Sequence, residues 1–90
     1  MTVEAITKYI FTDHAAIEIN RRGLTVKTID EILKSPEQRL DVRPGRVVLQ
    51  SRNEESGLEY LIRVFVDIDR NPAEVVTAYR TSKVLKYWRV

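Results

Sequence analysis

One segment, residues 58–68, constrains the fold more than any other part of the sequence. Apolar residues fill every second position in it: Leu58, Tyr60, Ile62, Val64, Val66 and Ile68. A period of two is that of a β-strand with one buried face, and here that face is expected to be the sheet side of the core. Because a lone strand is unstable in water, we expect neighbouring strands and a cover for the apolar face.

Three further segments read as strands, and they are residues 38–43, 46–52 and 73–80. The turn Pro44-Gly45 joins the first two as a hairpin. The polar residues 54–57 are expected to form a loop. A short extra strand is expected around residues 9–11, in addition to three or four antiparallel strands.

Two short helices are predicted before the strands. Thr12 and Asp13 are favourable N-cap residues, and the Arg21-Arg22-Gly23 sequence is typical of a helix end, so the first helix is expected over 13–22.

A second helix follows Thr25, its predicted cap, and stops at Ser35-Pro36. Its apolar residues at helical spacing are Val26, Ile29, Ile32 and Leu33. Residues 81–90 are expected to add one or two helical turns. The fold class is therefore α+β, with two N-terminal helices on one face of an antiparallel sheet.

The length and composition predict a single domain over residues 1–90. With 43% apolar and 31% charged residues, the chain is typical of a globular protein and unlike a disordered one. There is no cysteine and only one histidine, so we expect no metal site and no cofactor. No apolar run is long enough to cross a bilayer and no signal peptide is recognisable, so we expect a cytoplasmic protein that does not contact membranes.

The positive charge is concentrated at the C-terminus. Residues 80–90 contain Arg80, Lys83, Lys86 and Arg89 and no acidic residue, whereas residues 1–79 contain 13 acidic and 11 basic residues. Such a cluster attracts phosphate-rich partners, although a solvated basic tail is the simpler interpretation.

His14 is the first candidate for chemistry, because its side chain titrates near neutral pH. It lies in the first turn of the first predicted helix, where free backbone amides favour a bound anion. The alternatives are that His14 fixes the start of the helix or simply lies at the surface.

A second candidate set begins at the end of the last predicted strand and continues past it: Tyr79, Arg80, Thr81, Lys83, Lys86, Tyr87 and Trp88. Arginine and lysine bind phosphates, and aromatic rings stack on exposed bases, so this set indicates RNA contact. The alternative is that Tyr79 and Trp88 belong to the core and the cations are solvated.

The long strand also has a mixed face. Glu59, Arg63 and Asp67 alternate there with Leu61 and Phe65. This face could form a cleft lined by Arg63 and Tyr79, be covered by a partner chain, or form ion pairs between strands.

Four segments carry a family resemblance: Thr12-Asp13-His14-Ala15, Arg22-Gly23-Leu24-Thr25, Leu33 to Glu37, and Val76 to Lys83 with Lys86-Tyr87-Trp88. Together they resemble the family numbered 4258 among domains of unknown function, over nearly the whole chain. The plan of that family resembles the RelE-type and BrnT-type ribonuclease toxins of bacterial toxin–antitoxin pairs. The resemblance implies a RelE-like fold, a metal-independent RNA endonuclease, RNA or the ribosome as target, and an antitoxin-like protein partner.

Cleavage by the ribose 2′-hydroxyl requires a base, cations for the phosphorane and an acid for the leaving oxygen. We assign His14 as base or acid, Arg80 and Lys83 as the cations, and Tyr79 or Arg63 as a helper. One histidine cannot be both base and acid, so Tyr79, Lys83 or a glutamate would take the second role. RNA binding is assigned to Arg63, Thr81, Lys86 and Tyr87.

The rival hypothesis is a non-catalytic module that binds protein or nucleic acid. It would act as a small homodimer through the sheet face that bears Leu61 and Phe65.

Overall fold

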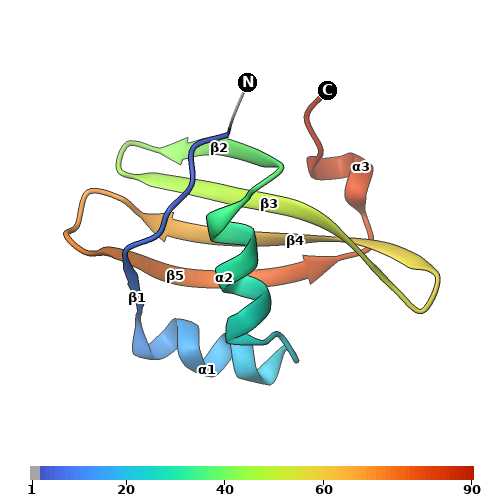
Figure 1. Cartoon of the computed structure of the whole chain (residues 1–90), viewed down its shortest axis with the longest axis horizontal. Coiled ribbons are helices and arrows are strands. Elements are labelled where there is room, and N and C mark those ends of the chain that lie inside the picture. Colours follow the sequence, from blue (N-terminus) through green and yellow to red (C-terminus); the bar gives the residue numbers. More distant parts are fainter. Residues whose placement is uncertain (1–2) are drawn as a thin grey trace.

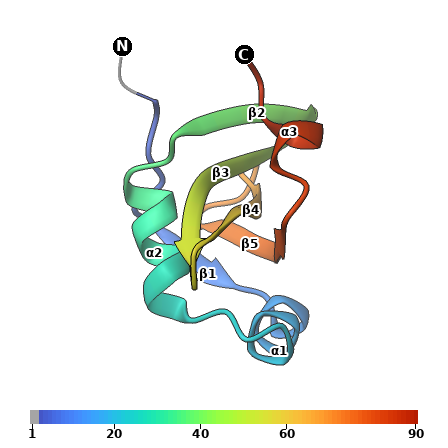
Figure 2. The same ribbon diagram turned by 90° about the vertical axis from the view of Figure 1, so that its right-hand side faces the viewer.

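The computed structural model describes residues 3–90, which form a five-stranded sheet with helices on both sides (Figures 1 and 2). The elements are β1 (Tyr9–Phe11), α1 (Asp13–Arg21), α2 (Val26–Lys34), β2 (Gln38–Arg43), β3 (Arg46–Glu55), β4 (Leu58–Asp67), β5 (Ala73–Thr81) and α3 (Val84–Tyr87). The α+β class with two N-terminal helices, a sheet and a short C-terminal helix is therefore confirmed.

The sheet has five strands, four of them joined by antiparallel pairings and one of them the short extra strand. Its order is β1-β5-β4-β3-β2. The short strand expected at residues 9–11 is β1, and it pairs with β5 in parallel, Tyr9 opposite Ala73. The other pairings are antiparallel, so the sheet is mixed.

The hairpin of β3 and β4 is longer than predicted. Its strands pair without a break from Arg46–Asp67 to Glu55–Leu58. Residues 54 and 55, expected in a loop, continue β3, and only Ser56 and Gly57 form the turn, both with positive φ.

The caps of both helices agree with the sequence patterns. The Thr12 hydroxyl accepts a hydrogen bond from the Ala15 amide at 3.0 Å, and the Thr25 hydroxyl accepts one from the Thr28 amide at 3.1 Å. Gly23 follows α1 with a φ of 71°, the left-handed conformation that glycine adopts without strain.

The core lies between the helices and one face of the sheet. Leu49, Ile62, Val64 and Val66 are buried there, together with residues of both N-terminal helices. The expected inward face of the long strand is thus confirmed at its centre. Its end residues Leu58 and Ile68, by contrast, are exposed, because they lie at the hairpin turn and just past the end of β4.

β1 pairs with only the first three residues of β5, and α1 lies along the rest of that strand (Figure 1). The Thr12 amide donates to the Val75 carbonyl at 3.1 Å, and Arg22 Nη1 donates to the Ala78 carbonyl at 2.8 Å. α2 crosses the core face of the sheet, whereas α3 lies on the opposite side (Figure 2). We call that opposite side the open face.

Candidate functional site

A row of polar side chains crosses the open face of the sheet. Gln38, Gln50, Arg63 and Tyr79 come from β2, β3, β4 and β5, and the strand register places them opposite one another. We call these four residues the polar row. They point away from the core because alternation directs neighbours such as Leu49 and Val64 into it.

Hydrogen bonds link the polar row from end to end. Gln50 Nε2 donates to Gln38 Oε1 at 2.7 Å, Arg63 Nε donates to Gln50 Oε1 at 2.8 Å, and Arg63 Nη1 donates to the Tyr79 hydroxyl at 2.8 Å. The guanidinium of Arg63 is therefore oriented from two directions. A planar cation held in this way keeps its remaining N–H groups in a fixed geometry.

Three aromatic rings surround the Arg63 guanidinium. Its central carbon lies 4.3 Å from the ring centroid of Tyr87, 5.3 Å from that of Phe65 and 5.8 Å from that of Tyr79. Phe65 and Tyr79 stack with centroids 6.0 Å apart, and Tyr87 meets Tyr79 edge-on. Cation–π attraction adds to the hydrogen bonds that hold Arg63.

The C-terminal segment, residues 84–89, is docked onto this row by polar contacts. Gln50 Nε2 donates to the Tyr87 carbonyl at 3.1 Å, the Arg89 amide donates to Gln38 Oε1 at 3.1 Å, and Gln38 Nε2 donates to the Arg89 carbonyl. The Arg52 guanidinium lies 4.3 Å from the Trp88 ring centroid. No residue of α3 is buried, so the segment is held by these contacts and not by an apolar core.

A depression of about 290 Å³ lies beside Arg63 and α3. Its lining is Leu40, Asp41, Val42, Val48, Arg63, Phe65, Lys86, Tyr87 and Arg89. Three of these residues are cations and one is an acid, so the depression favours an anion. Its apolar and aromatic walls also suit a planar group such as a base.

The pKa of Tyr87 is lowered from its ordinary value of 10.0. Hydrogen bonding with Tyr79 is the largest cause, and the charges of Lys86 and Arg63 act in the same direction against partial burial. A phenol in this setting loses its proton at a lower pH than a free tyrosine does.

Four of the predicted site residues lie together on the open face. Arg63 bonds Tyr79 and contacts the Tyr87 ring, while Lys86 lines the same depression and lies 5.3 Å from that ring. Arg63 and Tyr79, proposed from the sequence as the lining of a cleft, instead contact each other directly through a hydrogen bond, and of the two only Arg63 lines the depression. The alternative interpretation of this face, ion pairing between strands, is found at Asp67, which pairs with Arg46 on the neighbouring strand at 2.6 Å.

Arg80 lies on the other side of the sheet from Tyr79. Neighbours in a strand point to opposite faces, and Arg80 is opposite the core residue Ile62 in the register. Its guanidinium pairs with Glu55 at 2.6 Å and lies 5.1 Å from the Tyr60 ring. The structure therefore does not bring Arg80 to Arg63 and Tyr87.

The remaining predicted residues also lie apart from the polar row. His14 is exposed on α1, and no hydrogen bond or ion pair within residues 3–90 joins it to the other predicted residues. Lys83 is exposed in the connection to α3, where its amide donates to the Thr81 hydroxyl at 3.1 Å. Lys83 and Thr81 therefore shape the turn that leads to α3, and His14 has no part in it.

The sequence patterns do not single out Gln38 or Gln50, and they include Arg89 only as one cation of the C-terminal basic cluster. A polar residue in the apolar run Val47-Val48-Leu49-Gln50 is a signal of a buried hydrogen-bond network, but it does not name the partners. Leu61, predicted as part of a dimer surface, is fully buried within the chain, so of that pair only Phe65 remains partly accessible.

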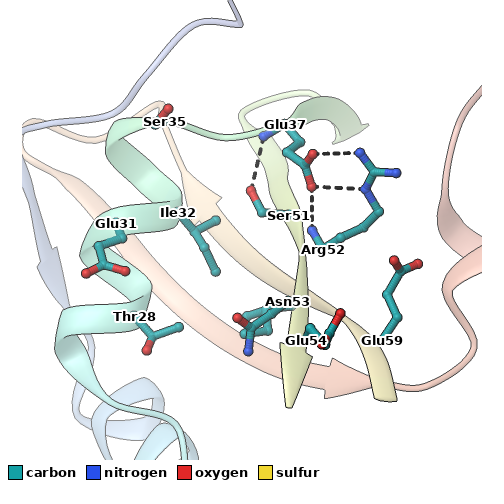
Figure 3. Close-up of a pocket in the computed structure, with 11 residues that line it drawn as sticks. Thr28, Glu31, Ile32, Ser35, Glu37, Ser51, Arg52, Asn53, Glu54 and Glu59 are labelled. Carbon is teal, nitrogen blue, oxygen red and sulfur yellow. Dashed lines mark hydrogen bonds and ion pairs between the residues drawn. The ribbon is translucent and has the colours of Figure 1, made fainter. Parts of the chain in front are cut away.

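A second hollow, of about 500 Å³, lies between α2 and the sheet (Figure 3). Glu31, Glu37, Glu54 and Glu59 line it, and its one cation, Arg52, is paired with Glu37 at 2.8 Å. This excess of carboxylates disfavours a phosphate-containing ligand. Within residues 3–90 there is no group of three or more potential metal ligands of the His, Cys, Asp or Glu type.

Neither the models of protein families, nor the curated proteins, nor the solved structures contain a match to this chain. The similarity to the family numbered 4258 therefore stays a prediction from the sequence. In the part of the chain that the structure describes, no helix is long and apolar enough to cross a membrane.

Proposed function

We propose that this chain binds single-stranded RNA on the open face of its sheet and cleaves it as a metal-independent, toxin-like endoribonuclease. The observation that carries the proposal is the arrangement of Arg63 between Tyr79 and Tyr87, beside Lys86 and Arg89. A RelE-like fold is part of the same proposal. It is supported by the order of the elements, in which two helices precede the four antiparallel strands.

Single-stranded RNA suits this surface better than a duplex. Proteins that bind unpaired strands combine cations for the backbone with aromatic rings for the bases, and both occur here within one shallow depression. In this proposal Phe65 and Tyr79 supply the aromatic surface, and Arg63, Lys86 and Arg89 contact phosphates.

The cleavage step needs no metal. The 2′-oxygen attacks the adjacent phosphorus, its proton passes to a base, and the bond to the 5′-oxygen breaks as that oxygen takes up a proton. The products are a 2′,3′-cyclic phosphate and a 5′-hydroxyl. Arg63 would stabilise the charge on the phosphorane, and the phenolate of Tyr87 would accept the 2′-hydroxyl proton.

This assignment differs from the sequence-based one. Tyr87 replaces His14 as the group that accepts the proton, and Arg63 replaces Arg80 as the principal cation, because Arg63 and Tyr87 are in contact. Tyr79 or Lys86 would act as the general acid that protonates the 5′-oxygen.

The test uses a labelled single-stranded RNA of mixed sequence, with EDTA present. Wild-type protein should bind the RNA and release fragments with cyclic phosphate ends. Tyr87→Phe should slow cleavage about tenfold or more with little loss of binding, because only the proton transfer is removed. Arg63→Met should weaken both.

Arg21→Met is the matched control. It removes one positive charge from an exposed position on α1 and should leave binding and cleavage unchanged. The rate should rise with pH through the lowered pKa of Tyr87, and Tyr87→Phe should lose that dependence. Intact RNA with wild-type protein, together with normal growth of cells that express it, would exclude the ribonuclease.

The second candidate is a non-catalytic RNA-binding module. It is favoured because two donor groups of Arg63 are already used in hydrogen bonds within the protein and are not available to a phosphate. Tight binding without cleavage would select it. This candidate includes a homodimer, and the mass of the protein measured by analytical ultracentrifugation shows whether the dimer forms.

A further inference from the structure

Gln50 is an unusual residue on the open face. Among residues 3–90 only Gln50 and Asp67 are polar and buried, and Gln50 has no exposed surface at all. Asp67 is explained by its ion pair with Arg46. Gln50 carries no charge, and neither α1 nor α2 covers it, because it lies on the opposite side of the sheet.

The carboxamide of Gln50 connects three parts of the chain. Its oxygen accepts from Arg63 Nε at 2.8 Å, and its nitrogen donates to Gln38 Oε1 at 2.7 Å and to the Tyr87 carbonyl at 3.1 Å. The same amide thus orients the Arg63 guanidinium and holds the backbone of the residue whose ring lies against it.

This arrangement determines which part of Arg63 can contact a ligand. Arginine has five N–H donors, and the bonds to Gln50 and Tyr79 use one on Nε and one on Nη1. Three donors therefore remain, in an orientation that Gln50 and Tyr79 determine together. Two parallel N–H groups in a fixed plane are what a phosphate requires for bidentate binding.

We propose that Gln50 is a positioning residue that sets the orientation of Arg63 and the seat of Tyr87 in the proposed RNA site. The inference rests on the proposed function for its ligand, but the positioning itself is a property of the free protein. Only glutamine combines the acceptor for Arg63 with two amide donors at this length. Glutamate keeps the acceptor and loses both donors, and methionine loses all three bonds.

The first experiment needs no RNA. In the free wild-type protein the Nε–H group of Arg63 should give a nitrogen-15 NMR signal that exchanges slowly with solvent. Gln50→Met should accelerate that exchange at least tenfold, an order expected for loss of a charge-assisted hydrogen bond, whereas Gln50→Glu should retain the signal. Leu49→Met, the neighbouring buried position on the core face, is the matched control and should leave it unchanged. An unchanged signal in Gln50→Met would overturn the inference.

The second experiment is a double-mutant cycle on RNA affinity. Gln50→Met and Arg63→Met should each weaken binding about tenfold, and the double variant should be no weaker than Arg63→Met within about twofold. A double variant weakened by the product of the single effects would show that Gln50 acts independently of Arg63 and would overturn the inference. Absence of RNA binding by the wild-type protein would instead reject the proposed function, and the NMR result would still decide the role of Gln50.

Discussion

The two faces of the sheet differ in what holds their residues together. On the core face, Leu49, Val64 and Ala78 lie side by side and pack against two helices. One residue further along each strand, on the open face, Gln50, Arg63 and Tyr79 lie side by side and are joined by hydrogen bonds through Arg63. The first set is held by burial of apolar surface and the second by direction-specific polar contacts. The same three strands therefore provide an apolar core on one side and the candidate site on the other. Substitutions on the two faces should differ in which property they affect.

The largest effect on stability is expected on the core face. Leu49→Ala removes a fully buried side chain and should lower the free energy of unfolding by about 3 kcal/mol, because the cavity cannot close completely. Urea denaturation followed by circular dichroism measures it. A loss below about 1 kcal/mol would show that this face is not the main source of stability.

Removal of the C-terminal segment tests the open face in the same way. A chain that ends at Ser82 loses the contacts of Tyr87, Trp88 and Arg89 with the polar row and with Arg52. It should still fold, with a loss on the order of 2 kcal/mol from a few net hydrogen bonds. If the shortened chain does not fold, the segment is part of the core, and the contrast between the faces fails.

A pH titration tests the ion pair between Asp67 and Arg46, the one ion pair within residues 3–90 that includes a buried residue. The bond from Arg46 holds the pKa of Asp67 below its ordinary value of 3.8, so the stabilisation is present above about pH 4 and is lost as pH falls through the lower pKa of the folded protein. Asp67→Asn should cost about 1–2 kcal/mol at pH 7, and this cost should shrink as the pH falls below about 4. Melting temperatures of both proteins across this pH range provide the measurement, and parallel curves would contradict it.

The smallest stability effect is expected for Lys86→Ala. Lys86 is exposed, so the free energy of unfolding should change by less than about 0.5 kcal/mol. RNA affinity should nevertheless fall, and its dependence on salt should weaken by about 0.7 in the logarithmic slope for one lost phosphate contact. Fluorescence anisotropy at several salt concentrations measures this slope. An unchanged slope would remove Lys86 from the proposed site.

Local patterns predicted much of the fold. Alternation in residues 58–68 identified the core residues Ile62, Val64 and Val66, and Thr12 and Thr25 marked the helix starts. The parallel pairing of β1 could not be predicted in this way. Three residues carry too weak a pattern, and their partner lies in β5 at the other end of the chain.

The candidate site was also predicted only in part, because local patterns place residues on strands but do not specify how the strands pair. The grouping of Arg63 with Tyr79 followed from the positions of both residues on strands, and the register confirms it. Tyr79 and Arg80 were assigned to one site, although alternation in a strand separates neighbours to opposite faces. The partners of Gln50 depend on strand register and on the path of the C-terminal segment, neither of which a single sequence specifies.

The pairing of β1 with β5 also bears on the order in which the chain folds. Tyr9 meets Ala73, so this contact closes a loop that includes most of the protein, at a larger entropic cost than the closing of the hairpins. The hairpin of β3 and β4, by contrast, joins residues close in sequence. Local contacts form faster than distant ones, so the hairpin is expected to nucleate folding and the N-terminal strand to dock late. During synthesis, the residues of β1 are made before the hairpin of β3 and β4 but would thus reach their final place after it.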